Sequence, residues 1–368
     1  MNCRGRRAIL CVMKRLALAV ALSSAVLSTS SPGGAADDPA RAVAAGAAAK
    51  LEAYYVYPSR AREAASLLRR NAVSGAYDGL KADALSKRVT DDIAAVLHDK
   101  HVRLQYSADV LPPAKPSGEG ESPEEKAANQ RFFRQVGYGL GRIAHLPGNV
   151  GYIDLRYFFQ TPETIGPVFD GIANSVAYSD AIILDLRRNH GGDPAAIARL
   201  LSHFLPPKTH LNDFVARGDG DAKVAESTYT EDVPGPRITA PLYVLTSGET
   251  FSGGEECAYD VQALKRGTLI GAVTGGGANP GDMRRIDDHF AIFVPDERAR
   301  NPITQTNWEG VGVKPDQAVP PERALAVAYQ AALDAKLRDP TLLTAQRDAL
   351  QKLRAKVDTM SDAEIFAL

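Results

Sequence analysis

Apolar side chains change their spacing along the chain, and this change separates two kinds of structure. Between residues 40 and 97 they recur three and four positions apart, as Leu51 and Tyr55 do, which is the period of one face of an α-helix. Pro58 and Gly75 interrupt this pattern, so we expect several helices rather than one. The N-terminal part of the chain is therefore predicted to be helical.

After Gly148 short runs of β-forming residues alternate with helical stretches. The predicted strands are residues 150–155, 181–186, 242–245, 269–273 and 290–294. The predicted helices are residues 161–176, 193–204, 253–265 and 321–337. Strands that alternate with helices indicate an α/β domain.

The remaining segments complete the predicted organisation. Residues 107–125 are rich in Pro, Gly, Ser and Glu, which is typical of an exposed connection. The C-terminal tail carries apolar residues at heptad spacing; we expect them to pack on their own domain, with a dimer interface as the alternative. The predicted divisions are a signal peptide (1–36), a helical N-terminal domain (37–106), an exposed linker and helix (107–145), a core domain (146–337) and a helical C-terminal tail (338–368).

The first 36 residues have the composition of an export signal. Five basic residues precede a short apolar run, and small residues follow up to Ala36. The run is too short for a membrane span, so we expect no stable membrane insertion. Cleavage near Ala36 predicts a periplasmic or secreted protein.

Composition and charge limit the possible functions. Of 368 residues, 45% are hydrophobic and 24% are charged, which excludes a disordered or collagen-like chain. The formal net charge is −1, and about −6 after signal removal, so we expect no nucleic-acid partner. Cys257 would be the single cysteine of the processed chain, which excludes an internal disulfide.

The strongest candidate for chemistry is Ser252, which follows a predicted strand and begins a predicted helix. Read as structure, Ser252 and Glu255 form a capping box at the helix start. Read as function, a hydroxyl at a helix N-terminus lies beside unpaired N–H groups that stabilise a developing oxyanion. The residues alone favour the capping box, because a nucleophile also needs a base.

A second candidate is the turn after the strand at residues 181–186, with the pattern D-x-R-x-N-x-G-G from Asp185 to Gly192. Paired glycines allow close approach of the backbone to a ligand and can direct N–H groups at it. On its own the turn is also compatible with a simple strand-to-helix connection in which Asp193 caps the next helix.

Together, the D-x-R-x-N-x-G-G turn and the S-x-x-E helix start resemble the C-terminal processing peptidase and tricorn family of serine peptidases. The resemblance is strongest to the bacterial branch related to interphotoreceptor retinoid-binding protein. It covers roughly residues 40–335 and includes further segments at 54–58, 98–102, 146–156, 274–281 and 308–316. The resemblance implies a crotonase/ClpP-like ββα superhelix core. Too few residues separate His101 from the next strand for a PDZ domain.

The same resemblance assigns the catalytic roles. Processing peptidases use a lysine 25 residues after the serine, but this position is Gly277, so a Ser–Lys dyad is excluded. Tricorn-like members use a histidine and a glutamate, and the matching positions are His101 and Glu309. A neutral imidazole can accept the serine proton while a carboxylate orients it. The accessory serine of such sites corresponds here to Lys100, whose role stays open.

The remaining site predictions concern backbone and turn residues. The family pattern assigns the oxyanion hole to the N–H groups of Gly192 and Gly253. We also predict that Gly276 and Gly277 line the substrate cleft, and we include His190 as a candidate substrate contact, with a solvated turn residue as the alternative. His98 and His101 lie at i, i+3 spacing, but no established zinc pattern surrounds them, so we expect no metal and no other cofactor.

The sequence thus predicts an exported serine peptidase with a Ser-His-Glu site, acting on peptide or protein substrates. Two alternatives remain open. One is a binding protein for retinoids, fatty acids or similar apolar ligands, with vestigial catalytic residues. The other is an esterase for small acyl groups. We also retain a possible homo-oligomer formed through the C-terminal helix.

Overall fold

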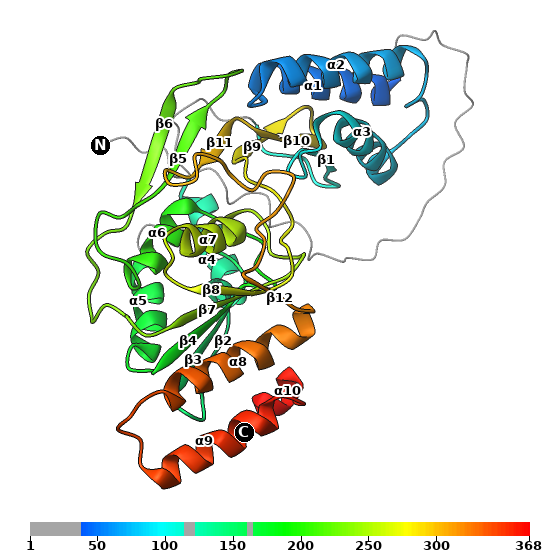
Figure 1. Ribbon diagram of the computed structural model, residues 1–368. Coiled ribbons are helices and arrows are strands. Elements are labelled where there is room, and N and C mark those ends of the chain that lie inside the picture. Colours follow the sequence, from blue (N-terminus) through cyan, green and yellow to red (C-terminus); the bar gives the residue numbers. More distant parts are fainter. Residues whose placement is uncertain (1–37, 114–121, 160–164) are drawn as a thin grey trace.

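The N-terminal helices pack on a small three-stranded sheet at one end of the molecule, as the computed structural model shows (Figure 1). The structure describes residues 38–113, 122–159 and 165–368, so the predicted signal peptide lies outside the described residues. The N-terminal unit consists of α1 (Pro39–Tyr54), α2 (Pro58–Val73), α3 (Ala82–Leu97), β1 (Arg103–Tyr106), β9 (Gly281–Arg285) and β10 (Phe290–Pro295).

Local sequence signals define these helices. Asp38 caps α1, because its side chain accepts a hydrogen bond from the N–H of Ala40 at 2.9 Å. Pro58 begins α2, where its missing N–H costs nothing. The predicted break at this proline is therefore the start of the second helix.

Strand β10 was expected within the core domain, but it joins the N-terminal unit. It pairs antiparallel with both β1 and β9 in the order β1-β10-β9. Its side chains Ile292 and Val294 are fully buried in one cluster with Leu51, Leu68 and Ile93 of the helices. The chain therefore returns from the core to complete the hydrophobic interior of the helical unit.

A six-stranded sheet forms the centre of the molecule, in the order β12-β8-β7-β4-β3-β2. All neighbouring strands are parallel except the antiparallel edge pair β2 and β3. The strands are β2 (Leu140–Leu146), β3 (Val150–Leu155), β4 (Ala181–Asp185), β7 (Leu242–Thr246), β8 (Thr268–Gly271) and β12 (Gln317–Ala318). The α/β fold predicted from the alternating pattern is confirmed.

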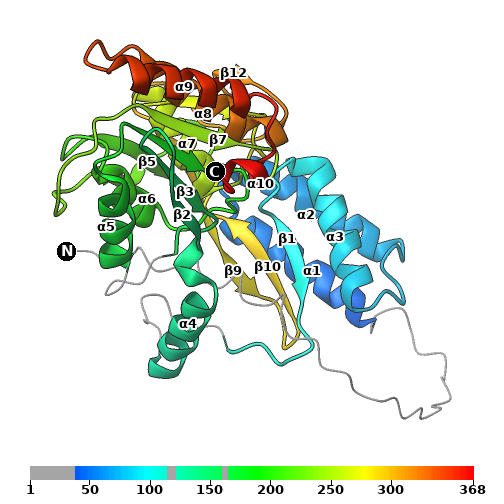
Figure 2. The ribbon, with the colours of Figure 1, turned by 90° about the horizontal axis from the view of Figure 1, so that it is seen from below.

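Helices cover both faces of this sheet, as Figure 2 shows. Alternate residues of a strand point to opposite faces, so Ile182 and Leu184 join one hydrophobic cluster and Ile183 joins another. One face is covered by α5 (Ile165–Val176), α6 (Pro194–Ser202) and α7 (Gly253–Ala263), and the other by α8 (Pro321–Leu337). Burial on both faces explains why these strands read as nearly continuous apolar runs.

Smaller elements lie around this centre. A third sheet has the order β11-β5-β6, formed by β5 (His210–Ala216), β6 (Val224–Tyr229) and β11 (Glu297–Arg300). Helix α4 (Pro123–Gln135) and the 3₁₀ turn Gly137–Gly139 precede β2. The tail forms α9 (Thr344–Val357) and α10 (Asp362–Ile365).

The tail packs on its own chain. Leu350, Val357, Met360 and Ile365 are buried in one cluster with residues of α8. The heptad-spaced residues are therefore used inside the chain, while Leu343 at the start of the series is exposed. Whether the protein forms a homo-oligomer stays a prediction.

We expect a chain ending at Asp339 to be less stable than the full chain. Each buried apolar side chain lost with α9 and α10 contributes about 1.5–3 kcal/mol, so the free energy of unfolding in urea should fall by several kcal/mol. Sedimentation of both chains would test the alternative. Unchanged stability combined with dissociation of a dimer would show that the tail is an intermolecular contact.

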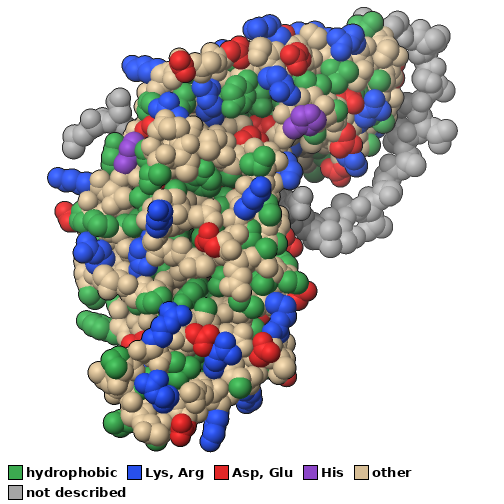
Figure 3. All heavy atoms as spheres, viewed as in Figure 1, with side chains coloured by type: hydrophobic (Ala, Val, Ile, Leu, Met, Phe, Trp, Pro, Cys, Tyr) green, Lys and Arg blue, Asp and Glu red, His purple; other side chains and the backbone are tan. Residues whose placement is uncertain are grey.

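The face of the molecule drawn in Figure 3 has mixed charge. On the face drawn in Figure 3, Lys and Arg side chains are interspersed with Asp and Glu. This face has no extended area of one charge, and the lack of a nucleic-acid partner stays a prediction. Among the described residues, no helix is long and apolar enough to cross a membrane.

Candidate active site

Ser252 lies at the junction between β7 and α7, where the backbone is strained. Its φ is 54° and its ψ is −123°, a conformation that is uncommon for a residue with a side chain. The N–H of Phe251, one residue earlier, donates to the carbonyl of Asn189 at 2.9 Å and ties this junction to the turn after β4. Among the described residues, no N–H of α7 donates a hydrogen bond to the Ser252 side chain. Its hydroxyl is therefore not used to stabilise the helix.

The glycine turn predicted from the second motif lies directly against this serine. Gly191 and Gly192 have φ values of +93° and +143°. A Cβ atom on Gly191 would lie 2.7 Å from the Cβ of Ser252, so only glycine fits there. Asn189 holds the turn, because its Oδ1 accepts the N–H of Gly191 at 2.9 Å and its Nδ2 donates to the carbonyl of Leu155 at 2.9 Å.

The two N–H groups predicted as an oxyanion hole are close together. A Cβ atom built on Gly253 would lie 3.0 Å from the nitrogen of Gly192. In the described part of the chain neither N–H donates a backbone hydrogen bond. Gly253 is also the first residue of α7, where unpaired N–H groups and the helix dipole favour a negative charge. This arrangement can stabilise an oxyanion beside Ser252.

His101 belongs to the short segment between α3 and β1, and its ring is buried against the residue before the serine. The ring centroids of His101 and Phe251 are 4.6 Å apart, and only 6% of His101 is exposed. Neither ring nitrogen has a hydrogen-bond partner among the described residues, so no hydrogen bond joins His101 to Ser252. Burial lowers the pKa of His101 to about 4, against an opposing effect of Asp99. The imidazole is therefore neutral at pH 7, the form that can accept a proton.

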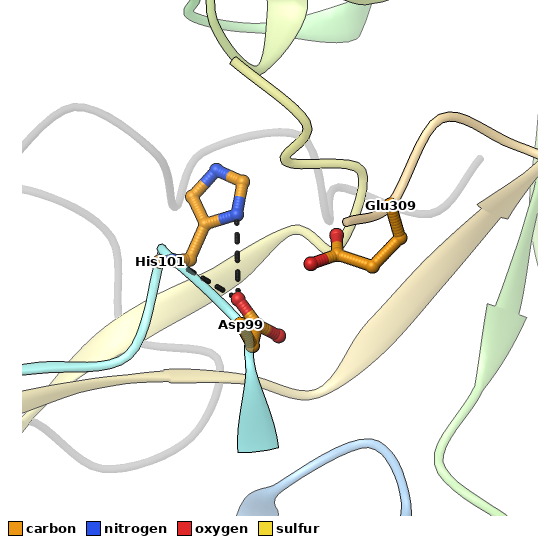
Figure 4. A group of neighbouring side chains, drawn as sticks. All are labelled: Asp99, His101 and Glu309. Atoms are coloured by element: carbon orange, nitrogen blue, oxygen red, sulfur yellow. Dashed lines mark hydrogen bonds and ion pairs between the residues drawn. The ribbon is translucent and has the colours of Figure 1, made fainter. Parts of the chain in front are cut away.

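Two carboxylates surround this imidazole, and only one of them was predicted. Ligand atoms of Asp99, His101 and Glu309 all lie within 4.8 Å of one another (Figure 4). Glu309 Oε2 accepts the N–H of Ala278 at 2.6 Å, while Oε1 is buried and has no hydrogen-bond partner in the described part of the chain. Burial, with a smaller contribution from Asp99, raises the pKa of Glu309 to about 8. The unpredicted carboxylate, Asp99, has the D-x-H spacing to His101 as its only sequence signal.

This group of three is not arranged like a typical zinc site. Ligands bound to one zinc ion at about 2.1 Å would lie roughly 3.4 Å from one another. Here His101 Nδ1 and Asp99 Oδ1 are 3.8 Å apart, and the whole group is spread more widely. His98, the other histidine of the segment, is exposed and outside this group.

Glu255 has more hydrogen-bond partners than the predicted capping box requires. Its carboxylate is fully buried and accepts the N–H of Ser252 at 2.9 Å, as in a capping box. It also accepts hydrogen bonds from the hydroxyl of Thr274 and from the N–H groups of Gly276 and Gly277, at 2.5, 2.6 and 2.8 Å. Burial raises the pKa of Glu255, while these hydrogen bonds oppose the shift. One carboxylate thus connects the serine to the glycine loop.

The backbone groups of two predicted substrate-binding glycines already have partners within the protein. Gly276 and Gly277 have their N–H groups bound to Glu255 and their carbonyls bound to Gly310 and Trp308. A Cβ atom on Gly277 would lie 2.7 Å from Cε1 of His101, so this glycine makes room for the imidazole. Substrate contact by these two residues stays a prediction.

The other two polar candidates lie at the surface of the site. His190 is exposed, and its ring centroid is 5.4 Å from that of Tyr157. Lys100 Nζ donates to the carbonyl of Gly275 at 2.6 Å, so it fixes the start of the glycine loop. Cys257 is fully buried in α7, as expected for a core residue.

The chain has measurable similarity to known proteins. Residues 149–319 match the family model described as Peptidase family S41. Tricorn protease of Thermoplasma volcanium is 26% identical over 197 residues, which are 53% of this chain and 17% of that protein. The chain therefore spans less than a fifth of the length of this relative.

Solved structures share the fold at low sequence identity. A protein of Parabacteroides merdae ATCC 43184, named as a candidate peptidase, has a TM-score of 0.56 and 16% identity, over 84% of this chain and all (100%) of that chain. A lipoprotein from Streptococcus agalactiae has a TM-score of 0.53 and 14% identity, over 85% of this chain and 100% of that chain. Residues 149–319 of this chain thus resemble Peptidase family S41, and the α/β fold agrees with that match.

Proposed function

We propose that this protein is a serine peptidase that hydrolyses peptide bonds through Ser252, with His101 as base and acid. The observation that carries the proposal is the strained serine at the start of α7, beside the N–H groups of Gly192 and Gly253, neither of which donates a backbone hydrogen bond within the described residues. A buried neutral imidazole packs on Phe251, the residue before this serine. The match of residues 149–319 to Peptidase family S41 supports the same activity.

The proposed reaction follows from these groups. Ser252 Oγ forms a bond to the substrate carbonyl carbon while its proton passes to His101, and the oxyanion binds the N–H groups of Gly192 and Gly253. His101 then returns the proton to the leaving amine as the C–N bond breaks. A water molecule hydrolyses the acyl-enzyme by the same route. Because His101 and Ser252 are not yet hydrogen-bonded, the two must approach when substrate binds, as is common for sites without substrate.

A fluorophosphonate probe tests this proposal without knowledge of the natural substrate. We expect a single label on the folded protein, and mass spectrometry of its peptides should assign the label to Ser252. Comparing hydrolysis of matched peptide and ester substrates would then separate a peptidase from an esterase. A folded protein that takes up no label, or that is labelled at another serine, would contradict the proposal.

The cavity at the carboxyl end of the sheet does not support the alternative that the protein binds an apolar ligand. This cavity has a volume of about 620 Å³. Its lining includes Arg142, Arg156, Arg187, Arg188, Asp154, Glu249, Glu322 and Asp362. A lining with so many charged groups does not suit a retinoid or a fatty acid, which need apolar walls. Displacement of a fluorescent fatty acid by unlabelled ligand would test the alternative directly.

The pH dependence of labelling should reflect the neutral imidazole. Only neutral His101 can accept the serine proton, and its pKa is lowered to about 4 by burial, with Asp99 opposing and Arg103 adding to the shift. We therefore expect the labelling rate to stay high from pH 7 down to pH 5 and to reach half its maximum near pH 4. Thermal unfolding at each pH would separate loss of structure from protonation. A half-maximum near pH 6.5 would mean that the imidazole is solvated.

Export and substrate choice are also part of the proposal. We infer that residues 1–36 direct the chain to the periplasm or outside the cell, on the basis of their basic and apolar composition. The N-terminal sequence of the protein recovered from each cell fraction would test this. An intact N-terminus in the cytoplasm would contradict it. Because the sequence predicts no PDZ domain, selection of substrates by their C-terminal tails is not part of the proposal.

A further inference from the structure

The Asp99 carboxylate is fixed beside His101 by hydrogen bonds from three residues. It is 2% exposed, and its Oδ1 accepts the backbone N–H of His101 at 2.9 Å. Its Oδ2 accepts hydrogen bonds from the hydroxyl of Tyr55 at 3.2 Å and from Nδ2 of Asn279 at 3.0 Å. These partners come from the end of α1 and from the loop before β9, so the carboxylate is fixed from both units of the molecule.

We propose that Asp99, rather than Glu309, is the carboxylate that positions the His101 imidazole for catalysis. The inference rests on the proposed function and assigns a residue that the Ser-His-Glu interpretation did not include. Asp99 Oδ1 lies 3.8 Å from His101 Nδ1, and Figure 4 shows this nitrogen facing the carboxylate while Nε2 points away from it. A proton on Nδ1 would face Asp99, which leaves the lone pair of Nε2 free to accept the serine proton.

The contacts of Glu309 favour a different role. One of its oxygens accepts the N–H of Ala278, which fixes the loop that follows Gly277. Its other oxygen is buried without a hydrogen-bond partner among the described residues, and burial with the nearby Asp99 raises the pKa of the group to about 8, which favours its neutral form. A neutral carboxyl group stabilises an imidazolium poorly. Glu309 therefore supports the loop under His101, and a second negative charge beside Asp99 is avoided.

The residue before His101 also supports Asp99 as the orienting carboxylate. Related sites are expected to have an accessory serine there, but the residue is Lys100, which donates to the carbonyl of Gly275. Lys100 thus contacts the glycine loop, and the neighbouring Asp99 is left to contact the ring. The carboxylate one residue before Lys100 in the chain, Asp99, is 3.8 Å from His101 Nδ1, and the proposal gives it the orienting role.

The rate of fluorophosphonate labelling of Ser252 tests this assignment. We expect Asp99→Asn to lower the second-order rate constant about 10³-fold, because an amide can hold the wrong tautomer of a catalytic histidine. Glu309→Gln should lower the same rate constant less than 10-fold. The acid limb of the pH profile should move to lower pH in Asp99→Asn, because loss of the negative charge makes His101 less basic.

Asp92→Asn is a matched control for folding. Asp92 Oδ2 also accepts hydrogen bonds from a tyrosine and an asparagine, Tyr77 at 2.8 Å and Asn71 at 2.9 Å, but it lies in α3 away from His101. Its replacement should lower the unfolding temperature as Asp99→Asn does, with no change in the labelling rate. The ¹⁵N shifts of His101 in the Ser252→Ala background give a second readout, since Asp99→Asn should change the tautomer.

Each outcome separates this inference from the proposed function. Failure of the wild-type protein to label would contradict the peptidase proposal itself. Normal labelling of the wild type and of Asp99→Asn would overturn only the role of Asp99. A larger loss in Glu309→Gln than in Asp99→Asn would return the orienting role to Glu309.

Discussion

Ser252→Ala is expected to lower kcat/KM for peptide or ester hydrolysis by about 10⁴-fold or more, since no other group can form the acyl-enzyme. Fluorophosphonate labelling should disappear with it. The change should have little effect on stability, because the hydroxyl makes no capping hydrogen bond and alanine keeps the same backbone. The measurement compares initial rates and thermal unfolding of the two proteins.

A matched control comes from another serine at a helix. Ser175 in α5 donates its hydroxyl to the carbonyl of Ile172 at 2.6 Å, within its own helix. Ser175→Ala should leave both hydrolysis and labelling unchanged. If Ser252→Ala retained more than a tenth of the activity, the hydrolysis would have to come from another residue or from a contaminating enzyme.

The inner strands of the central sheet and the helices beside them could be predicted because burial on both faces gives nearly continuous apolar runs. The edge strand β2 (Leu140–Leu146) was not predicted, and it begins within residues 107–145, which were predicted to be an exposed linker and helix. The predicted strand at residues 150–155 coincides with β3, and the predicted helix at residues 321–337 coincides with α8. Short strands such as β1 and β12 were not predicted, because four or two residues carry too little periodicity.

Long-range assembly was harder to predict than local structure. Residues 290–294 were correctly predicted as a strand, but nothing local indicates that β10 pairs with β1, almost 190 residues earlier, across the N-terminal helices. Pairings of this kind depend on tertiary packing, which the alternating pattern of one segment cannot specify.

In the candidate site, too, local features could be predicted and long-range contacts could not. Ser252 and the turn ending at Gly192 lie together because both follow neighbouring parallel strands, β7 and β4, whose carboxyl ends meet at one edge of the sheet. Asp99 was missed as a site residue, since its importance comes from burial and from contacts with Tyr55 and Asn279, which are distant in sequence. A carboxylate two residues before a histidine is too common a pattern to identify such a role.

Gly192→Ala should be the most damaging change in the turn, because a side chain there has no room. The φ of Gly192 is +143°, and a Cβ atom would lie 2.1 Å from the carbonyl oxygen of Phe158. This contact is with backbone, so the turn itself must move and carry the N–H of Gly192 away from the oxyanion position. Loss of one such donor costs about 10²–10³ in rate, and the strained backbone costs about 1–3 kcal/mol of stability.

Gly248→Ala separates this effect from the general loss of a glycine. Gly248 lies in the loop before Ser252, its φ is outside the left-handed region, and a Cβ atom there would have nothing within 4 Å. Its replacement should leave the labelling rate within about threefold of wild type and the stability within about 0.5 kcal/mol, as for most surface substitutions. Labelling of Gly192→Ala at the wild-type rate would show that the oxyanion is stabilised elsewhere, because a turn displaced by this clash cannot keep its N–H in place.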